Sequence, residues 1–304
     1  MGVFGRHHAA KYRSVAETEL AGVADINAEA RREAVERFAV PAYADWRALR
    51  GEVDLVSICS PASTHAEIVR GFLEAGAHVL VEKPIATTLR EAEELIALAA
   101  RHGLVLTVGH QERFIFARSG LLDRAQAPRV IECVRAGPWT GRSTDVSVVL
   151  DLMVHDLDLV HRLVPGALEQ VRANGRRLHS EFADEMSANL TFSDGCEVAL
   201  FASRMAEERR RTMRLGYADG VVEIDFLNRA VTNTTARSLG PLEMADPLGE
   251  SVSAFVAAVE RGADTLVRPE EARRALASAL LIEEASVQGT QASPLVAQEI
   301  AAFA

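Results

Sequence analysis

The sequence predicts an α/β fold, in which a doubly wound parallel sheet is followed by an α+β domain with a mostly antiparallel, open sheet. Over roughly the first third of the 304 residues, short apolar runs alternate with helical patterns, as in parallel sheets with right-handed helical crossovers. After about residue 120, alternating segments and Asp-Gly turns are typical of antiparallel hairpins. We therefore expect two domains, residues 1–120 and 121–304.

The elements of the first domain follow from its apolar runs and helical periodicity. Thr88 followed by Glu91 predicts a capping box, which marks the start of one helix. In chain order we expect a strand at 20–25, a helix at 28–38, a strand at 54–60, a helix at 64–75, a strand at 78–82, a helix at 88–102 and a strand at 104–108.

The second domain has one strong helix signal, at 151–163, and two hairpin signals. The dipeptides Asp194-Gly195 and Asp219-Gly220 predict tight turns between β-rich runs. The paired strands are expected at 188–192 with 197–201 and at 213–217 with 221–226, and two amphipathic helices at 249–261 and 269–287.

The composition argues against several classes of protein. A net charge of −10 disfavours nucleic acid as the main partner, and no stretch reaches the roughly 20 apolar residues of a membrane span. The first residues do not form a signal peptide. Three widely spaced cysteines, Cys59, Cys133 and Cys196, fit a reducing cytoplasm, and none lies in a cluster that predicts a metal site.

The first residues carry part of a dinucleotide-binding fingerprint, G-x-G-x-x-G. Gly2 and Gly5 have the spacing of its last two glycines, and Val3 and Phe4 lie between them. Asp25 ends the strand that follows, where a carboxylate binds an adenosine ribose and repels a 2′-phosphate. This favours NAD over NADP as the cofactor. The alternative is a plain turn before a helix.

The first glycine of the fingerprint and the strand before it are absent from the sequence. That strand is the central one of a doubly wound sheet, so we expect the natural chain to begin ~6–8 residues earlier, the length of a strand with its turn. A sheet without this strand would have an open core. This is the one argument for a binding protein that keeps the fold without activity.

Residues 79–84 read Val-Leu-Val-Glu-Lys-Pro, an apolar strand that ends in Lys83. Pro84 disfavours helix at the residue before it, so Lys83 is held at the carboxyl edge of the sheet, where open α/β sheets bind their ligands. The alternative is a lysine that solvates the sheet edge. The sequence leaves open whether the Lys83-Pro84 peptide is cis.

Asp151 and His155 stand four residues apart in the helix expected at 151–163, so they share one face. A neutral histidine can take up a proton at pH 7, and a neighbouring carboxylate orients its ring. The alternative is helix capping by Asp151 and a His155 that is satisfied at a domain interface. We assign the flanking Asp156 and Asp158 to solvent or capping.

Together these motifs resemble the Gfo/Idh/MocA family of nicotinamide-dependent sugar oxidoreductases, over the whole chain. They are Gly2-x-x-Gly5, Asp25, Glu82-Lys83-Pro84 and Asp151-x-x-x-His155. Segment 60–65 also matches the family's loop after its fourth strand. The resemblance implies a Rossmann domain that binds NAD, with a cofactor site formed by Gly2, Val3, Phe4, Gly5, Asp25, Ser60, Pro61, His65, Glu82 and Lys83.

The resemblance also implies the chemistry and the assembly. His155 takes the hydroxyl proton, Lys83 stabilises the developing alkoxide and Asp151 orients the site, while hydride passes from the sugar carbon to NAD. Segment 142–156 is similar to the branch that oxidises the 3-hydroxyl of UDP-N-acetylglucosamine on the way to 3-amino sugars for lipid A. In this family the open sheet face of the second domain usually pairs with another subunit, which implies a homodimer or homotetramer.

A nucleotide diphosphate needs cationic partners, and four arginines stand on segments that could supply them. They are Arg113, Arg135, Arg142 and Arg204. The run 209–211 is a further source of cations or a solvated strand end. Two alternatives stay open: a dehydrogenase of a free polyol or monosaccharide, such as an inositol, and a binding protein of the same fold. The latter has no chemical need for the lysine, aspartate and histidine together.

Overall fold

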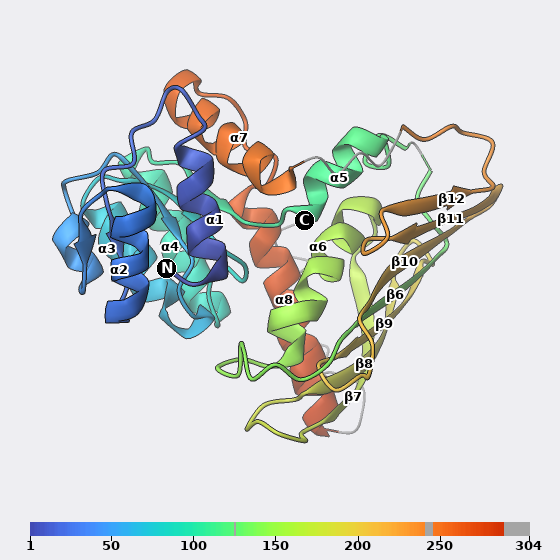
Figure 1. Ribbon diagram of the computed structural model, residues 1–304. Coiled ribbons are helices and arrows are strands. Elements are labelled where there is room, and N and C mark those ends of the chain that lie inside the picture. The colour runs from blue at the N-terminus through green and yellow to red at the C-terminus, as the bar shows by residue number, and fades with distance from the viewer. Residues whose placement is uncertain (125, 241–245, 289–304) are drawn as a thin grey trace. The chain divides into compact units, whose positions relative to one another are not determined.

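The computed structural model describes residues 1–124, 126–240 and 246–288 (Figure 1). The chain divides into two compact units, Met1–Phe114 with Asp246–Arg273, and Ile115–Ala245 with Arg274–Ala304. The first unit contains parallel strands and helices, and the second a mostly antiparallel sheet, which confirms the predicted fold class. The first unit also includes a late segment, 246–273, that lies far beyond the boundary expected near residue 120.

The parallel strands of the first unit lie in two sheets. One pairs β1 (Val23–Ala24) with β2 (Ala42–Tyr43), and the other has the order β3 (Leu55–Ile58), β4 (His78–Val81), β5 (Leu106–Val108). The expected strand at 20–25 is shorter than predicted, because only its residues 23 and 24 pair with β2. The helical elements of this unit are α1 (Val3–Tyr12), α2 (Ala28–Phe38), η1 (Trp46–Leu49), η2 (Ala62–Thr64), α3 (His65–Glu74), α4 (Leu89–His102) and α7 (Pro247–Arg261).

Local capping fixes the ends of several of these helices. The capping box predicted at Thr88 is present, since its hydroxyl accepts from Glu91 N and the Glu91 carboxylate accepts from Thr88 N. Asn27 caps α2, and Asp246 caps α7 by accepting from Gly249 N at 3.0 Å. These side chains satisfy backbone donors that a helix leaves unpaired at its first turn.

α7 belongs to the core of the first unit although it comes late in the chain. Tyr12 of α1, Leu80 of β4, and Val252 and Phe255 of α7 form one buried apolar cluster. At the start of α7, Lys11 donates to Asp246 at 2.6 Å. The first unit therefore buries its central strands with residues from both ends of the sequence.

The second unit is built on a seven-stranded sheet. Its order is β12-β11-β10-β6-β9-β8-β7, and every neighbouring pair is antiparallel except β6 with β9. Both predicted hairpins are confirmed, with Gly195 at φ +83° between β8 and β9 and Gly220 at φ +150° as the first residue of β11. The strands are β6 (Val130–Ala136), β7 (Leu168–Arg176), β8 (Glu185–Phe192), β9 (Glu197–Ser203), β10 (Arg210–Tyr217), β11 (Gly220–Asp225) and β12 (Ala230–Asn233).

Helices lie on one face of this sheet. Figure 1 shows α6 (Val154–Leu163) and α8 (Pro269–Gln288) against that face, and His161 of α6 bonds Ser278 of α8 at 2.7 Å. α5 (Glu112–Ser119) carries the chain from the first unit into the second. In the part of the second unit that the structure describes, no helix covers the opposite face of the sheet in Figure 1.

Candidate functional site

The N-terminus of α1 fits the phosphates of a dinucleotide. Gly2 is its N-cap, no side chain caps it, and its first turn has no acidic residue, so backbone N–H groups are open to an anion. Val3 and Phe4 are exposed in that turn, and a side chain at Gly2 would meet nothing within 4 Å. Gly5 lies on the same first turn.

Asp25 directly follows β1, where the fingerprint requires a carboxylate. Its Oδ1 accepts from Asn27 N at 2.8 Å, and Oδ2 pairs with the α-amino group of Met1. The side chain is half-buried. These residues fit a dinucleotide, which when bound supplies the hydride acceptor of an oxidation.

The loop after β3 is fixed by His65, which is 1% exposed at the start of α3. The Nδ1 atom lies 2.7 Å from the carbonyl oxygen of Pro84, and Nε2 lies 3.0 Å from that of Ser60. Burial lowers the pKa of His65 and outweighs these bonds, which raise it. In this structure His65 joins the backbone of Ser60-Pro61 to that of Pro84, and a direct role in cofactor binding stays a prediction.

Glu82 and Lys83 follow β4. Glu82 is buried, and its Oε1 accepts from His8 Nε2 at 2.8 Å and from the Gln111 amide at 3.3 Å. Gly109 is needed beside it, because a Cβ there would lie 2.9 Å from the Glu82 carboxyl carbon. Lys83 is half-buried, and the peptide between Lys83 and Pro84 is cis.

Lysine is rare in this chain. Of the 33 lysines and arginines, only Lys11 and Lys83 are lysines. An arginine therefore supplies the positive charge almost everywhere else. A lysine offers a compact point charge and a different hydrogen-bond geometry from the planar fork of arginine.

Asp151 and His155 lie in the second unit at a change of helix type. The regular helix expected from 151 is wrong in its first turn: residues Val149–Met153 form a π-helical turn, η3, and α6 begins at Val154. The hydroxyl of Ser147 accepts from the N–H groups of Val149 and Leu150, which starts the helical structure two residues early. Both Asp151 and His155 are half-buried.

The assignment of Asp156 and Asp158 to solvent or capping is wrong. They are 2% and 1% exposed. Arg135 of β6 holds Asp156 with two parallel bonds, from Nε at 3.1 Å and from Nη2 at 2.8 Å. A buried carboxylate needs such a partner, because desolvation of an unpaired charge is costly.

Three of the four arginines expected to bind substrate are buried in internal ion pairs. Arg113 pairs with Glu271, Arg135 with Asp156 and Arg204 with Asp184. Arg142 is exposed on the loop after β6. Contact of these arginines with a substrate stays a prediction.

Arg204 and Asp184 join three loops at one end of the sheet. Arg204 donates to Asp184 Oδ1 at 2.9 Å and to the carbonyl groups of Ser143 and Val146, and its guanidinium lies 5.5 Å from the Trp139 ring. Burial by itself raises the pKa of Asp184, but hydrogen bonds from backbone N–H groups, His179 first among them, hold that pKa well below its ordinary value. The pair therefore orders the loop that carries Arg142.

Two features of this geometry escaped the sequence interpretation. His8 contacts Glu82 and lies one helical turn from the buried Tyr12, so the apolar face of α1 was the available signal. The sequence interpretation also missed Asp184, which accepts from the N–H groups of residues 178–180, four to six positions before it, and from Arg204, 20 positions after it. In the described ranges no group of three or more His, Cys, Asp or Glu side chains forms a metal site, and no helix there is long and apolar enough to cross a membrane.

Two family models match most of the chain. Residues 1–110 match the oxidoreductase family with an NAD-binding Rossmann fold, and residues 121–223 match the Gfo/Idh/MocA C-terminal domain. The chain is 39% identical over 232 residues to UDP-N-acetylglucosamine 3-dehydrogenase of Acidithiobacillus ferrooxidans, covering 76% of this chain and 74% of that protein. It is 27% identical over 289 residues to D-apiose dehydrogenase of Paraburkholderia graminis, covering 86% and 76%.

Solved structures show the same fold. A structure of the Acidithiobacillus ferrooxidans enzyme superposes with a TM-score of 0.88 at 36% identity, covering 95% of this chain and 96% of that one. Scyllo-inositol dehydrogenase of Lactobacillus casei, with bound NAD(H) and scyllo-inositol, shares the fold at 20% identity, with a TM-score of 0.81 over 96% of each chain. The chain belongs to the Gfo/Idh/MocA family of oxidoreductases with an NAD-binding Rossmann fold.

Proposed function

We propose that the protein oxidises the 3-hydroxyl of UDP-N-acetylglucosamine with NAD as the hydride acceptor. The observation that carries the proposal is the position of Lys83. It is one of two lysines in the chain and lies at the carboxyl end of β4, beside the buried Glu82. The choice of substrate is supported by the 39% identity to a UDP-N-acetylglucosamine 3-dehydrogenase. The three thiols fit a reducing cytoplasm, where we place the reaction.

Each of three side chains has one task in the proposed reaction. His155 accepts the proton of the reacting hydroxyl as a general base, and Asp151 orients its ring. The Lys83 ammonium donates a hydrogen bond to the same oxygen and stabilises the negative charge that develops on it. Arg142, exposed on its loop, is our candidate for contact with the diphosphate.

A substrate panel tests this function. The protein is incubated with NAD and one of UDP-N-acetylglucosamine, free N-acetylglucosamine or myo-inositol, and NADH absorbance is followed. We expect turnover of the nucleotide sugar and little of the other two. Preferred oxidation of myo-inositol would identify a polyol dehydrogenase, and no NADH with any sugar, despite measurable NADH binding, would favour a binding protein.

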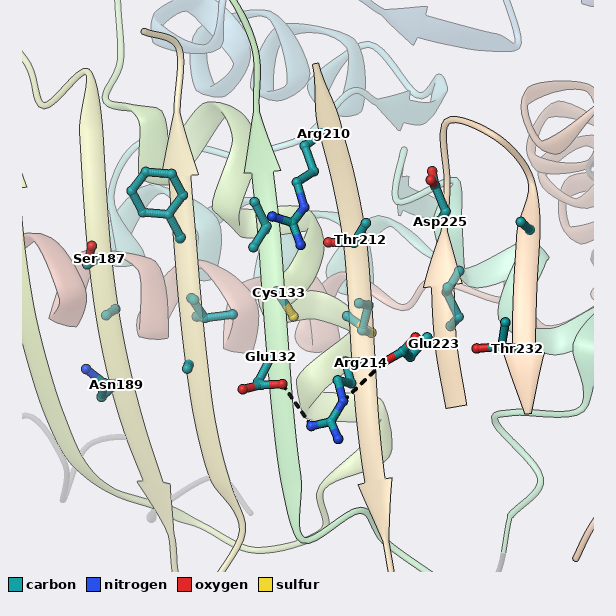
Figure 2. A pocket seen from close by; sticks show the side chains of 18 residues that line it. Glu132, Cys133, Ser187, Asn189, Arg210, Thr212, Arg214, Glu223, Asp225 and Thr232 are labelled. Atoms are coloured by element: carbon teal, nitrogen blue, oxygen red, sulfur yellow. Dashed lines mark hydrogen bonds and ion pairs between the residues drawn. The ribbon is translucent and has the colours of Figure 1, made fainter. Parts of the chain in front are cut away.

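We also propose that the protein is a homo-oligomer that pairs through the open face of its seven-stranded sheet. This face has a hollow of ≈ 690 Å³ lined by residues of six strands (Figure 2). At its centre Arg214 pairs with Glu132 at 2.9 Å and with Glu223 at 3.2 Å. Partly buried Phe201 and Val134 add apolar surface that a second copy would cover.

Charge reversal on this face tests the assembly. Arg214→Glu would place three carboxylates in a row on each copy, so we expect a lower mass by size-exclusion chromatography with light scattering. Arg32→Glu, on the exposed face of α2, is the matched control and is expected to keep the wild-type mass. A monomeric wild-type protein at micromolar concentration would contradict the proposal.

A further inference from the structure

A chain of hydrogen bonds, buried at His8, Tyr12 and Glu82, connects α1 to the residue before Lys83. The Tyr12 hydroxyl lies 2.8 Å from Ser57 Oγ, Ser57 Oγ lies 2.9 Å from His8 Nδ1, and His8 Nε2 lies 2.8 Å from Glu82 Oε1. His8 is 2% exposed and Tyr12 is 6% exposed. The chain thus joins α1, β3 and the end of β4 inside the first unit.

The direction of these bonds follows from counting donors and acceptors. Burial raises the pKa of Tyr12, so its hydroxyl keeps its proton and donates it to Ser57. Ser57 then donates to His8 Nδ1, and the Nε2–H of His8 donates to Glu82. The reverse order would leave the Tyr12 proton with no acceptor among the described residues. One arrangement therefore satisfies the three donors of this chain, with the His8 proton on Nε2.

His8 and its neighbours hold Glu82 from several sides. Gln111 donates to the oxygen that His8 also contacts, and the Gly109 backbone packs against the carboxyl group. The backbone of Glu82 is bonded to β3 through its N–H, which donates to Ile58 O at 2.9 Å. The peptide that leads into Lys83 is therefore fixed at both its backbone and its side chain.

We propose that His8 is a positioning residue for Lys83: it holds Glu82, and through Glu82 it fixes the place from which the lysine ammonium acts. The inference rests on the proposed catalytic role of Lys83. It adds a link between the two ends of the cofactor site, because α1 carries the fingerprint glycines at its N-terminus and His8 in its middle. The same helix then binds the cofactor phosphates at its N-terminus and, through His8 and Glu82, positions Lys83.

A matched pair of variants separates this role from general packing. The amide of glutamine reaches the position of His8 Nε2, so His8→Gln keeps a donor to Glu82. Asparagine reaches only the position of Nδ1, so His8→Asn keeps the hydrogen bond with Ser57 and loses the one to Glu82. Since small displacements at a reacting centre can cost about 100-fold, we expect His8→Asn to lower kcat by roughly that factor with little change in KM, and His8→Gln to restore most of it. Tyr12→Phe, which leaves the Ser57 hydroxyl in place, is the control within the same network and is expected to stay near wild type.

A second measurement does not depend on activity. Reductive methylation with ¹³C-formaldehyde labels the two lysines and the α-amino group, and Lys11→Arg and Lys83→Arg assign the signals by NMR. We expect a shifted or broadened Lys83 signal in His8→Asn and a wild-type signal in His8→Gln. If His8→Asn does not fold, His8→Leu, which fills the buried site without a donor to Glu82, takes its place with the same expected changes.

The outcomes for the two proposals differ. A wild-type protein that oxidises no sugar would overturn the proposed function, while the Lys83 signal would still decide the role of His8. If the wild type turns over and His8→Asn keeps both its kcat and its Lys83 signal, the positioning role is wrong. Equal losses in His8→Asn and His8→Gln would show a structural role only, and would overturn it as well.

Discussion

Replacing Lys83 with methionine is expected to lower kcat by about 10²–10³-fold, because one preorganised donor to a developing oxyanion contributes on that scale. The half-buried side chain leaves β4 beside a Glu82 that is held by His8 and Gln111, so its position is defined before substrate binds. Methionine keeps much of the length of the side chain and removes its charge. Steady-state kinetics with UDP-N-acetylglucosamine measure the loss, and NADH binding followed by fluorescence separates a loss in the chemical step from a loss of cofactor affinity.

The other lysine of the chain provides the control. Lys11→Met removes an ammonium that pairs with Asp246 at the start of α7, away from the proposed chemistry, and should leave kcat near wild type. Lys83→Arg keeps the charge but replaces a point donor with a planar fork, so we expect only partial activity. Wild-type kcat in Lys83→Met would remove the lysine from the mechanism.

The largest effect on stability is expected at Arg135. Arg135→Met leaves the carboxylate of Asp156 buried at 2% exposure without its bidentate partner, and the loss of one member of a buried pair typically costs about 3–5 kcal/mol of unfolding free energy. Chemical unfolding by urea, followed by circular dichroism, measures this cost. Because Asp156 directly follows His155, the pair also ties the proposed base to β6.

Two further variants test the reason for that cost. Asp156→Leu combined with Arg135→Met removes both charges, and we expect it to recover much of the lost stability, since apolar replacement of a whole buried pair is often neutral. Arg32→Met breaks an exposed pair with Glu29 and should change stability little. If Arg135→Met lowers the unfolding free energy no more than Arg32→Met does, another group must stabilise the buried Asp156 carboxylate.

The elements that could be predicted from the sequence are those with local causes. The Asp194-Gly195 hairpin needs only its own turn and flanking strands, and the capping box at Thr88 needs only four residues. The π-helical turn before α6 could not be predicted from the spacing of Asp151 and His155. It depends on how Ser147 satisfies the first backbone donors.

The arginines show that a local sequence pattern does not identify the partner of a buried charge. Arg135 and Arg204 find their carboxylates 21 and 20 residues away, and Arg113 pairs with Glu271, 158 residues away. Sequence position identifies a cation but not its partner, so a buried structural pair and a phosphate ligand give the same pattern. The pairing of His8 with Glu82, 74 residues apart, could not be predicted for the same reason.

The late position of α7 affects how the chain is made. Domains usually fold in the order in which the ribosome releases them. Here Tyr12 and Leu80 emerge early, but Phe255, which is fully buried against them, is synthesised only after the entire seven-stranded sheet. The nucleotide-binding unit therefore stays unfinished during most of translation, with apolar surface exposed until residue 261 leaves the exit tunnel. A fragment that ends near residue 120 would keep that nascent, incomplete state permanently.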